Sequence, residues 1–495
     1  MKGAIILSNK VGFDNDKYLK MQSERIRKRI SQFGGKLYLE FGGKLFDDFH
    51  ASRVLPGFKP DSKLQMLLQL KDEAEIVMVI NTEDIEKNKV NGNIGITYDA
   101  DVIRLYNVFS QFGLYVSSVV LSRYSSGHPS VEAFQHRLKA LGIKVYHHYN
   151  ISGYPSNLQH IISDDGYGKN DYIETSRKLI VVTAPGPGSG KMATCLSQLY
   201  HDYKRGVAAG YAKFETFPIW NLPLRHPINI AYEAATSDLN DVNMIDPFHL
   251  EAYGETTVNY NRDVEIFPVL NAMFEKIIGE SPYKSPTDMG VNMAGNCIID
   301  NEAVIEACKQ EIIRRYYAAQ CARRTGSADD EQIYKLELLM NQVGVTAADR
   351  KVVAASLEKE QLTGAPAAAM ELPDGTIITG KTSNLLGASS ALLLNALKYF
   401  GGLDDELLLM SPEVIEPIQS LKVDHLGNLN PRLHTDETLI ALAICANTSE
   451  KAKCAMEQLS KLKGCEVHST VILSAVDERT FKRLGVNLTC EPKFQ

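Results

Sequence analysis

The sequence has no long apolar segment and no long run of basic residues. None of its 495 residues lies in an uninterrupted apolar stretch of about 18 residues, the length that a membrane-spanning helix requires. The first ten residues, MKGAIILSNK, hold too short an apolar segment for a signal peptide. The net charge of −7 does not provide the basic surface that nucleic acids bind. We therefore expect a cytoplasmic protein that binds neither nucleic acid nor a membrane.

Cysteine pairs with the spacing of a redox or zinc motif are absent as well. The 8 cysteines are scattered, and none forms a C-x-x-C pair. This pattern indicates reduced thiols rather than a disulfide framework or a zinc knuckle. The histidines also lack the ligand spacing of a metallohydrolase, such as H-E-x-x-H, so no metal site is predicted from them. Cys195 is expected to be a packed thiol rather than a reactive one.

The most informative segment is a glycine-rich loop between a predicted strand and a predicted helix. It lies within residues 179–203, LIVVTAPGPGSGKMATCLSQLYHDY. The first residues form a short β-branched run typical of a buried strand, and the glycines allow a sharp turn. Apolar residues then recur at helical spacing from Leu196 to Tyr203. Such a loop points backbone N–H groups and the positive end of a helix dipole at one place, which favours an anion, most often phosphate.

This glycine-rich loop, residues 185–191, matches only part of the P-loop pattern G-x-x-x-x-G-K-[ST]. Pro185 stands at the first glycine, and Met192 stands where a hydroxyl would bind Mg²⁺. A tight connection without a ligand is the alternative to phosphate binding, but an exposed lysine between glycines has little packing value. The residues predicted to bind the phosphate ligand are Gly186, Gly188, Ser189, Gly190, Lys191 and Thr194. Lys191 is also a catalytic candidate.

Apolar runs alternate with helical patterns in the N-terminal part of the chain. Strands are predicted at residues 36–41, 76–80, 114–121, 144–149, 179–182 and 211–217, with helices at 61–72, 99–112 and 130–141. This alternation is typical of an α/β fold with a mainly parallel sheet covered on both faces, here Rossmann-like or P-loop-like. Ligands bind beyond the carboxyl ends of such strands. We therefore expect the glycine-rich loop, residues 42–44 and Asp84 to lie at one edge.

A long polar segment, residues 225–262, follows the predicted sheet strands. It concentrates carboxylate, amide, imidazole and guanidinium groups over a length too great for a plain connection. Residues 242–246 resemble a poor Walker-B strand, in which Asp246 would hold Mg²⁺. Capping and turn formation by Asp and Asn are an equally good explanation for any single residue. We predict Asp246 and His249 as catalytic residues and Asn261 and Arg262 as ligand-binding residues.

The remaining chain divides into a helical part and a mixed part. Helices are predicted at residues 302–323, 330–343 and 347–362. The paired arginines Arg314-Arg315 and Arg323-Arg324 are expected on solvated faces; the alternative is an arginine that reaches the phosphate site of a neighbouring subunit. Residues 364–370, GAPAAAM, are predicted to be a linker. The predicted domains are an α/β phosphate-binding domain at 1–295, a helical subdomain at 296–365 and a C-terminal α/β subdomain at 366–495.

The C-terminal pattern resembles the three-layer cytidine deaminase fold. A hairpin with its turn at Asp374-Gly375 precedes a helix at 388–400, a strand at 420–423, a long helix at 435–461, a strand at 467–473, a helix at 477–484 and a last strand near Val486. The zinc motifs H-x-E and P-C-x-x-C are absent, which excludes a deaminase. A helix cap explains only part of the polar segment 424–434. His425 and His434 are therefore catalytic candidates, and Arg432 is a ligand-binding candidate.

Several long stretches resemble a bacterial family known as domain of unknown function 1846, or uncharacterised protein family 0371. They include LIVVTAPGPGSGKMATC at residues 179–195 and VDHLGNLNPRLH at 423–434, with others at 36–58, 211–236, 241–270 and 285–295. The resemblance covers nearly the whole chain. It implies an α/β N-terminal region, a helical subdomain and a deaminase-like C-terminal subdomain, and it implies that the departure from the P-loop pattern belongs to the family.

The sequence favours two functions. A third, a metal-dependent hydrolase that uses His226, His249, His425 and His434 with nearby Asp residues, has no ligand spacing to support it. The first is an enzyme, a transferase or ligase, that binds a nucleotide with Mg²⁺ or another phosphorylated small molecule at residues 185–191 and carries out group transfer. The second is a non-catalytic protein that senses such a ligand and assembles into a homo-oligomer. The number of polar residues at 225–262 and 424–434 favours the enzyme.

Overall fold

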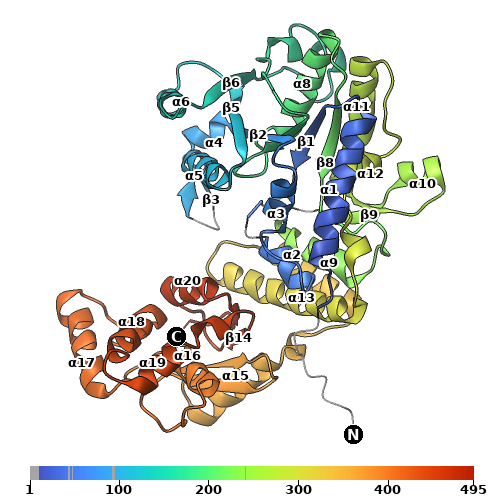
Figure 1. The fold of residues 1–495 in the computed structure, drawn as a ribbon. Coiled ribbons are helices and arrows are strands. Elements are labelled where there is room, and N and C mark those ends of the chain that lie inside the picture. The colour runs from blue at the N-terminus through green and yellow to red at the C-terminus, as the bar shows by residue number, and fades with distance from the viewer. Residues whose placement is uncertain (1–10, 43–44, 47, 92–94, 240, 495) are drawn as a thin grey trace. The chain divides into compact units, whose positions relative to one another are not determined.

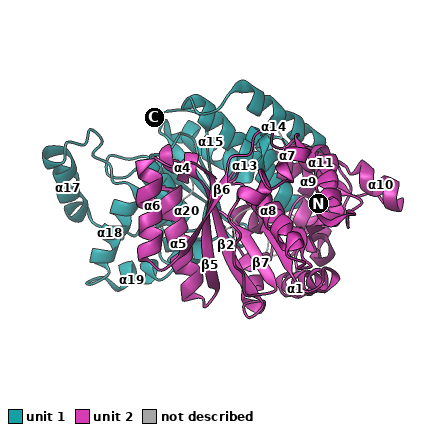
Figure 2. Ribbon diagram, turned by 90° about the horizontal axis from the view of Figure 1, so that it is seen from above, with its two compact units in different colours: residues 1–10, 234–239, 306–495 teal, residues 11–233, 240–305 magenta. Residues whose placement is uncertain are grey.

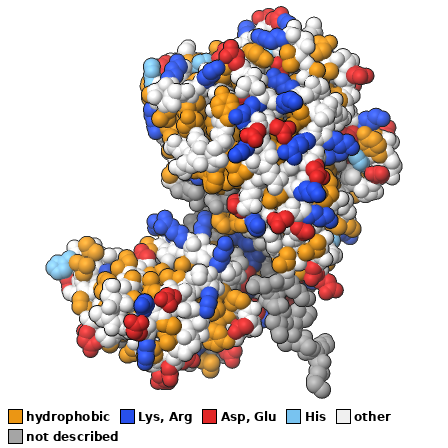
Figure 3. Space-filling model, in the orientation of Figure 1, with side chains coloured by type: hydrophobic (Ala, Val, Ile, Leu, Met, Phe, Trp, Pro, Cys, Tyr) orange, Lys and Arg blue, Asp and Glu red, His pale blue; other side chains and the backbone are white. Residues whose placement is uncertain are grey.

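The computed structural model describes residues 11–494 except 43–44, 47, 92–94 and 240 (Figure 1). The chain divides into two compact units (Figure 2). Of the described residues, those within 11–233 and 241–305 belong to unit 2, and those within 234–239 and 306–494 belong to unit 1. Within the described residues, no helix combines the length and the hydropathy needed to cross a bilayer. On the face drawn in Figure 3, acidic and basic side chains are interspersed.

Unit 2 is built on a seven-stranded sheet in the order β11-β8-β1-β7-β2-β5-β6. All of its pairings are parallel. The strands are β1 (Leu37–Phe41), β2 (Ala74–Asn81), β5 (Tyr115–Tyr124), β6 (Lys144–Tyr149), β7 (Leu179–Thr183), β8 (Gly210–Phe214) and β11 (Gly290–Val291). β1, β2 and β7 are buried along their whole length, as a sheet covered on both faces requires. The predicted α/β class with a mainly parallel sheet is therefore confirmed.

Helices connect these strands and cover both faces of the sheet. They are α1 (Asn15–Gln32), α2 (Phe49–Val54), α3 (Ser62–Gln69), α4 (Thr82–Glu86), α5 (Tyr98–Gln111), α6 (Pro129–Ala140), α7 (Leu158–Ile161), α8 (Lys191–Lys204), α9 (Pro227–Ala235), α10 (Pro247–Tyr253), α11 (Asn261–Ile278) and α12 (Pro286–Met289). Leu196 and Leu199 of α8 and Phe267 of α11 pack on one face, in a single core with Tyr38 and Val182. Neighbouring strand residues point to opposite faces. Phe214 accordingly lies on the other face, where Lys63 of α3 sits over its ring.

Small strands and 3₁₀ turns complete unit 2. The antiparallel pairs are β3 (Val90–Asn91) with β4 (Ile96–Thr97) and β9 (Asn243–Ile245) with β10 (Val258–Tyr260). The short turns include 3₁₀ segments at Tyr167–Lys169 and Ala294–Cys297. Of the predicted turn at residues 42–44, Gly43 and Lys44 lie outside the described residues.

Unit 1 places helices around a four-stranded sheet in the order β13-β12-β14-β15. β12 (Ala367–Glu371) is antiparallel to both β13 (Ile377–Lys381) and β14 (Glu466–Ser469), whereas β14 and β15 (Asn487–Cys490) are parallel. The hairpin turn at Asp374-Gly375 is as predicted, with Gly375 at a φ of 84°. The helices are α13 (Asn301–Arg324), α14 (Asp330–Val343), α15 (Lys351–Thr363), α16 (Ala388–Phe400), α17 (Pro412–Ser420), α18 (Thr435–Cys445), α19 (Glu450–Met456) and α20 (Ala475–Arg483).

Three secondary-structure predictions for this unit are wrong. The predicted linker 364–370 contains most of β12, an inner strand buried at every position. Its alanines are short enough for α15 and α16, both of which contact β12, to approach the sheet closely. Residues 420–423 are helical, at the end of α17 and in the π-helical turn Leu421–His425. The predicted helix 435–461 is interrupted after Cys445, because the side chain of Ser449 caps a new helix, α19.

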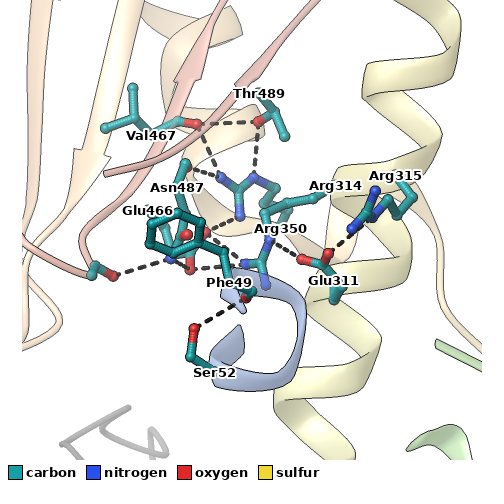
Figure 4. Close-up of polar contacts among 11 residues, drawn as sticks. Phe49, Ser52, Glu311, Arg314, Arg315, Arg350, Glu466, Val467, Asn487 and Thr489 are labelled. Carbon is teal, nitrogen blue, oxygen red and sulfur yellow. Dashed lines mark hydrogen bonds and ion pairs between the residues drawn. The ribbon is translucent and has the colours of Figure 1, made fainter. Parts of the chain in front are cut away.

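A buried ionic network joins the helices of unit 1 to its sheet (Figure 4). Glu466 on β14 forms ion pairs with both Arg314 of α13, at 2.9 Å, and Arg350 at the start of α15. Arg350 is 1% exposed, and it also donates to the carbonyls of Val467 and Asn487 at 2.9 and 2.8 Å. Arg314 is buried, so the prediction that this arginine lies on a solvated face is wrong. Burial disfavours the charged form of Glu466, but the two arginines hold its pKa below the usual value.

Candidate functional site

The glycine-rich loop connects β7 to α8 at the carboxyl edge of the unit 2 sheet. Gly188 and Gly190 have φ values of 72° and 90°, a conformation that side chains with a Cβ rarely adopt. A Cβ at Gly186 would overlap the ring of Tyr98. Ser122 at the end of β5 donates a hydrogen bond of 2.6 Å to the Ser189 carbonyl. These contacts explain the need for glycine and hold the loop against two neighbouring elements.

The N-terminus of α8 has no side-chain cap. Its N-cap is Gly190, and Lys191 is the first helical residue. Among the described residues, the hydroxyls of Ser189 and Thr194 have no hydrogen-bond partner, although these residues are only 3% and 1% exposed. The first-turn N–H groups of a helix need a partner that the helix itself does not supply. An anion at this position would supply one.

The loop lies where the connections of the sheet change direction. The chain leaves β2 through α5 toward β5, whereas it leaves the adjacent strand β7 through α8 toward β8, on the other side of β1. Right-handed crossovers in opposite directions place α5 and α8 on opposite faces of the sheet. In Figure 2, α5 and α8 lie on different sides of the strands. Doubly wound sheets bind ligands in the crevice at such a switch point.

Cys195 is a buried, packed residue of α8, as predicted. Burial, reinforced by the nearby Glu40 carboxylate, raises the pKa of its thiol well above the ordinary value, whereas Lys191 acts in the opposite direction. The thiol therefore stays protonated and is not a nucleophile. The same interactions place Glu40 and Lys191 in the neighbourhood of the first two turns of α8.

A cluster of charged residues occupies the same edge of the sheet, at the ends of β1 and β8. In the strand register, Glu40 of β1 lies between Val182 of β7 and Lys213 of β8. Val182, shortly before the loop, and Lys213 are therefore two strand spacings apart, roughly 10 Å. Lys213 forms ion pairs with Glu215, at 2.9 Å, and with Asp263 in the first turn of α11. The Tyr260 hydroxyl donates to Glu215 at 3.2 Å, and the Tyr211 hydroxyl donates to Glu40 at 2.7 Å.

Burial shifts the protonation of this β8 cluster, which consists of Glu40, Tyr211, Lys213, Glu215, Tyr260 and Asp263. It raises the pKa of Glu215 to about 7, and Lys213 only partly opposes that rise. Burial disfavours the charged form of Lys213, but Asp263 and Glu215 outweigh that effect and raise the lysine pKa. The cluster therefore combines a carboxyl group that titrates near neutral pH with a fixed positive charge.

Replacing Glu215 by glutamine is expected to flatten the pH dependence of the stability of unit 2. Because the folded-state pKa of about 7 lies above the ordinary 4.5, the folded protein binds the extra proton. Protonation of Glu215 therefore stabilises the folded protein, and this contribution to the free energy of unfolding is complete below pH 4.5 and is lost as pH rises through 7. The wild-type protein should lose up to about 1.4 kcal/mol per pH unit relative to Glu215→Gln in this window. Urea unfolding of both proteins from acid to neutral pH measures this, and parallel stability curves would contradict the shifted pKa.

The polar segment 225–262 is divided among several roles. Asp246 is completely buried and caps α10, accepting from the backbone N–H groups of Phe248 and His249. Its second oxygen accepts from the Thr287 hydroxyl at 2.6 Å and the Thr287 backbone N–H at 3.2 Å. The structure thus gives Asp246 the capping role, and its oxygens are already engaged. His249 lies 2.9 Å from the Ser285 hydroxyl.

Asn261 and Arg262 begin α11, next to the β8 cluster. The Asn261 side chain accepts from the backbone of Val242 at 3.1 Å, and Arg262 forms an ion pair of 2.6 Å with Asp241. α11 packs against α8. These two predicted ligand-binding residues directly follow Tyr260, a member of the β8 cluster, in the chain.

The predicted C-terminal residues lie in unit 1. Arg432 lines a surface cavity of about 470 Å³ and donates to the Ser383 carbonyl at 2.8 Å. His425 is an exposed residue at the end of the π-helical turn. His434 lies 2.9 Å from Asp477, which raises its pKa. Ser474 approaches the same ring nitrogen at 3.2 Å, so these three residues tie the starts of α18 and α20 together rather than forming a relay.

The sequence prediction missed the β8 cluster. Glu40, Lys213 and Glu215 occur inside or directly after apolar strand runs, in KLYLEF and YAKFETF. Charged residues at buried strand positions are rare unless they are paired. Their occurrence in these apolar runs could therefore have indicated a charged cluster from the sequence. Across the described parts of the chain, no group of three or more His, Cys, Asp or Glu side chains is arranged to hold a metal ion.

Comparison with known proteins matches the chain along most of its length. Family models described as domain of unknown function DUF1846, N-terminal and C-terminal, match residues 11–344 and 348–495. The UPF0371 protein cu0538 of Corynebacterium urealyticum is 58% identical over 488 residues, which cover 99% of this chain and 98% of that protein. The UPF0371 protein str1377 of Streptococcus thermophilus is 57% identical over 486 residues, 98% of each chain. A UPF0371 protein of Streptococcus pneumoniae is 56% identical over the same span.

Proposed function

Since this chain belongs to the DUF1846 family, whose curated members are called UPF0371 proteins, we propose that it is an enzyme acting on a phosphorylated small molecule. The glycine-rich loop binds the phosphate, and groups at the same edge of the sheet carry out group transfer. The observation that carries this proposal is the uncapped N-terminus of α8, with Lys191 as its first residue and two buried hydroxyls beside it.

Three features of the loop support an anion as the ligand. The first-turn N–H groups of α8 and the helix dipole favour negative charge. The Lys191 ammonium group has no ion-pair or hydrogen-bond partner in the described part of the chain, so it is available to a phosphate oxygen. The hydroxyls of Ser189 and Thr194 are further donors, because a buried hydroxyl without a partner is costly.

The loop supports phosphate binding better than Mg²⁺-dependent nucleotide hydrolysis. Met192 occupies the position of the usual Mg²⁺-binding hydroxyl, and the oxygens of Asp246 are engaged by backbone and hydroxyl donors. The proposed ligand class, phosphorylated small molecules, still includes nucleotides. The sheet order and the position of the loop support a Rossmann-like or P-loop-like relationship for unit 2. The β12–β13 hairpin followed by helices and two parallel strands supports a deaminase-like fold for residues 366–495.

The β8 cluster supports catalysis rather than binding alone. A carboxyl group with a pKa near neutrality can accept a proton from an attacking hydroxyl or donate one to a leaving oxygen. Glu215 has such a pKa, about 7. A paired lysine close by stabilises negative charge that develops during transfer. Perturbed pKa values of this kind are concentrated at functional sites.

Replacing Lys191 by alanine is expected to weaken phosphate binding by about 1.5–3 kcal/mol, since one charged hydrogen bond is lost. Calorimetric titration with inorganic phosphate and with a panel of phosphorylated small molecules measures the change. Lys169→Ala is the matched control, because Lys169 lies in the same unit with its side chain 61% exposed. Equal affinities for wild type and Lys191→Ala would refute binding at this loop. Binding that needs Lys191 but yields no product from any bound ligand would instead support a non-catalytic sensor.

A further inference from the structure

A second cavity opens at the carboxyl ends of β2, β5 and β6. It has a volume of about 280 Å³, and its lining includes Glu83, Glu86, Arg123, Tyr124, His128 and Asn150. The first two residues belong to α4, which follows β2, and the arginine and tyrosine end β5. The cavity therefore lies at the edge of the sheet where the glycine-rich loop also begins.

The cavity is connected to the glycine-rich loop through the end of β5. Ser122, the residue before Arg123, donates to the Ser189 carbonyl at 2.6 Å. A Cβ at Gly190 would lie 3.3 Å from the Ser122 side chain, so the loop and the end of β5 are in direct contact. The loop and the cavity therefore contact consecutive residues of β5, Ser122 and Arg123.

The backbone at the mouth of the cavity has an unusual conformation. Arg123 has a φ of 51°, in the left-handed region, and the β5–β6 register shifts between Leu121 and Tyr124. The Thr82 hydroxyl holds the Arg123 carbonyl at 2.9 Å. Left-handed residues other than glycine and strand irregularities are concentrated at functional sites, where they redirect side chains. Here they accompany the entry of Arg123 and Tyr124 into the cavity lining.

The chemistry of the lining fits a neutral, hydroxyl-rich group rather than a second phosphate. Glu83 lies 3.3 Å from the Arg123 guanidinium group, and Glu86 lies 3.3 Å from the His128 ring, so the fixed positive charge of the lining is already paired. A carboxylate has about four lone-pair positions, so each can still accept hydrogen bonds from hydroxyls. The volume is slightly below the range of about 300–1,000 Å³ typical of pockets for drug-sized ligands, which suits one ring.

Tyr124 provides an aromatic ring in the lining of this cavity. The ring of Tyr124 packs against His147, with the centroids 4.1 Å apart, and against Tyr149 at 6.0 Å. These contacts hold the tyrosine in place, and its ring and hydroxyl offer both apolar and polar contact to a ligand. A sugar ring presents the same combination, with apolar C–H faces and hydroxyl edges.

We propose that this cavity binds the sugar ring of a phosphorylated sugar whose phosphate lies on the glycine-rich loop. The inference rests on the proposed function and specifies its substrate class. A free sugar phosphate and a nucleoside monophosphate share this chemistry, because both carry a phosphate ester on a hydroxylated ring. Glu86 accepts from ring hydroxyls, and Lys191 binds the phosphate.

Calorimetric titrations with inorganic phosphate, ribose 5-phosphate, glucose 6-phosphate and AMP test this inference. The wild type should bind at least one of the three sugar phosphates about tenfold or more tighter than inorganic phosphate, since hydrogen bonds to charged groups are added. Glu86→Gln should lose about tenfold in affinity for that ligand while its affinity for inorganic phosphate stays within about twofold. Lys191→Ala should weaken both. Tighter binding of AMP than of ribose 5-phosphate would identify a nucleotide as the source.

The outcomes separate the inference from the proposed function. The control is Glu450→Gln, at a side chain that is 93% exposed and lies in unit 1, and it should leave every affinity unchanged. If inorganic phosphate binds through Lys191 but sugar phosphates bind no tighter, or Glu86→Gln has no effect on them, the inference is overturned and the proposed function stands. If no phosphate compound binds, both are overturned.

Discussion

Replacing Glu466 by glutamine is expected to lower the free energy of unfolding of unit 1 by about 3–5 kcal/mol, because breaking a buried ion pair leaves an uncompensated charge. Here Glu466 pairs with two buried guanidinium groups, those of Arg314 and Arg350. Glu311 also pairs with Arg314, at 2.8 Å. The glutamine side chain has nearly the same shape but no charge. Arg314 would keep its ion pair with Glu311, whereas Arg350 would lose its ion pair with Glu466 in a region of low dielectric constant.

Urea unfolding followed by circular dichroism measures this loss. The matched control is Glu450→Gln, since Glu450 is almost fully exposed and lies 3.9 Å from Lys453, and we expect no measurable change. Replacing Glu311, Arg314, Arg350 and Glu466 together by apolar residues of similar volume should restore much of the stability, as buried ion networks are often no more stable than apolar packing. A Glu466→Gln protein as stable as wild type would show that the network is hydrated rather than buried.

Replacing Lys213 by methionine is expected to destabilise unit 2 by about 3–5 kcal/mol at pH 8, because the change leaves buried carboxylates without a cation. Glu215 and Asp263 both form ion pairs with Lys213, and their side chains are only 5% and 14% exposed. Methionine keeps the length and apolar contacts of the lysine stem. The loss should be smaller at pH 5, since Glu215, with a pKa of about 7, is then protonated.

Unfolding in urea at pH 5 and pH 8 tests this prediction. Lys87→Met serves as the control, since the Lys87 side chain is 73% exposed and pairs with Glu83 at 3.6 Å, and its stability should match wild type at both pH values. The double variant Lys213→Met, Glu215→Gln should recover part of the loss at pH 8. An equal loss at both pH values would mean that packing, rather than charge, explains the effect of Lys213→Met.

Local patterns in the sequence predicted much of unit 2. The short apolar runs at β1, β2, β5, β6 and β7 alternate with helical patterns, and this alternation defines a parallel sheet. The glycine-rich loop was recognisable because its constraints are local, as the positive φ values of Gly188 and Gly190 illustrate. Strand order could not be predicted in the same way. Nothing local indicates that β7 pairs between β1 and β2.

Contacts between distant segments were beyond local patterns. Arg350 meets Val467 and Thr489, more than a hundred positions further along the chain, and its pairing with Glu466 makes burial possible. The β8 cluster likewise joins β1, β8 and α11. Ala367–Met370 looked like a linker because short side chains lack β propensity, although an inner strand between two close helices favours them. Local patterns therefore pointed to the loop but not to the charged groups beside it.

The position of β1 in the sheet has a consequence for synthesis of the protein on the ribosome. Both neighbours of β1 come late, since Leu37 pairs with Leu179 on one side and Gly210 on the other. At about 5–20 residues per second, the roughly 140 residues that separate Leu37 from Leu179 take about 7–30 s to synthesise. During that time an apolar strand has emerged without a partner in the sheet. The chain therefore exposes this strand before either of its neighbours in the sheet has been synthesised.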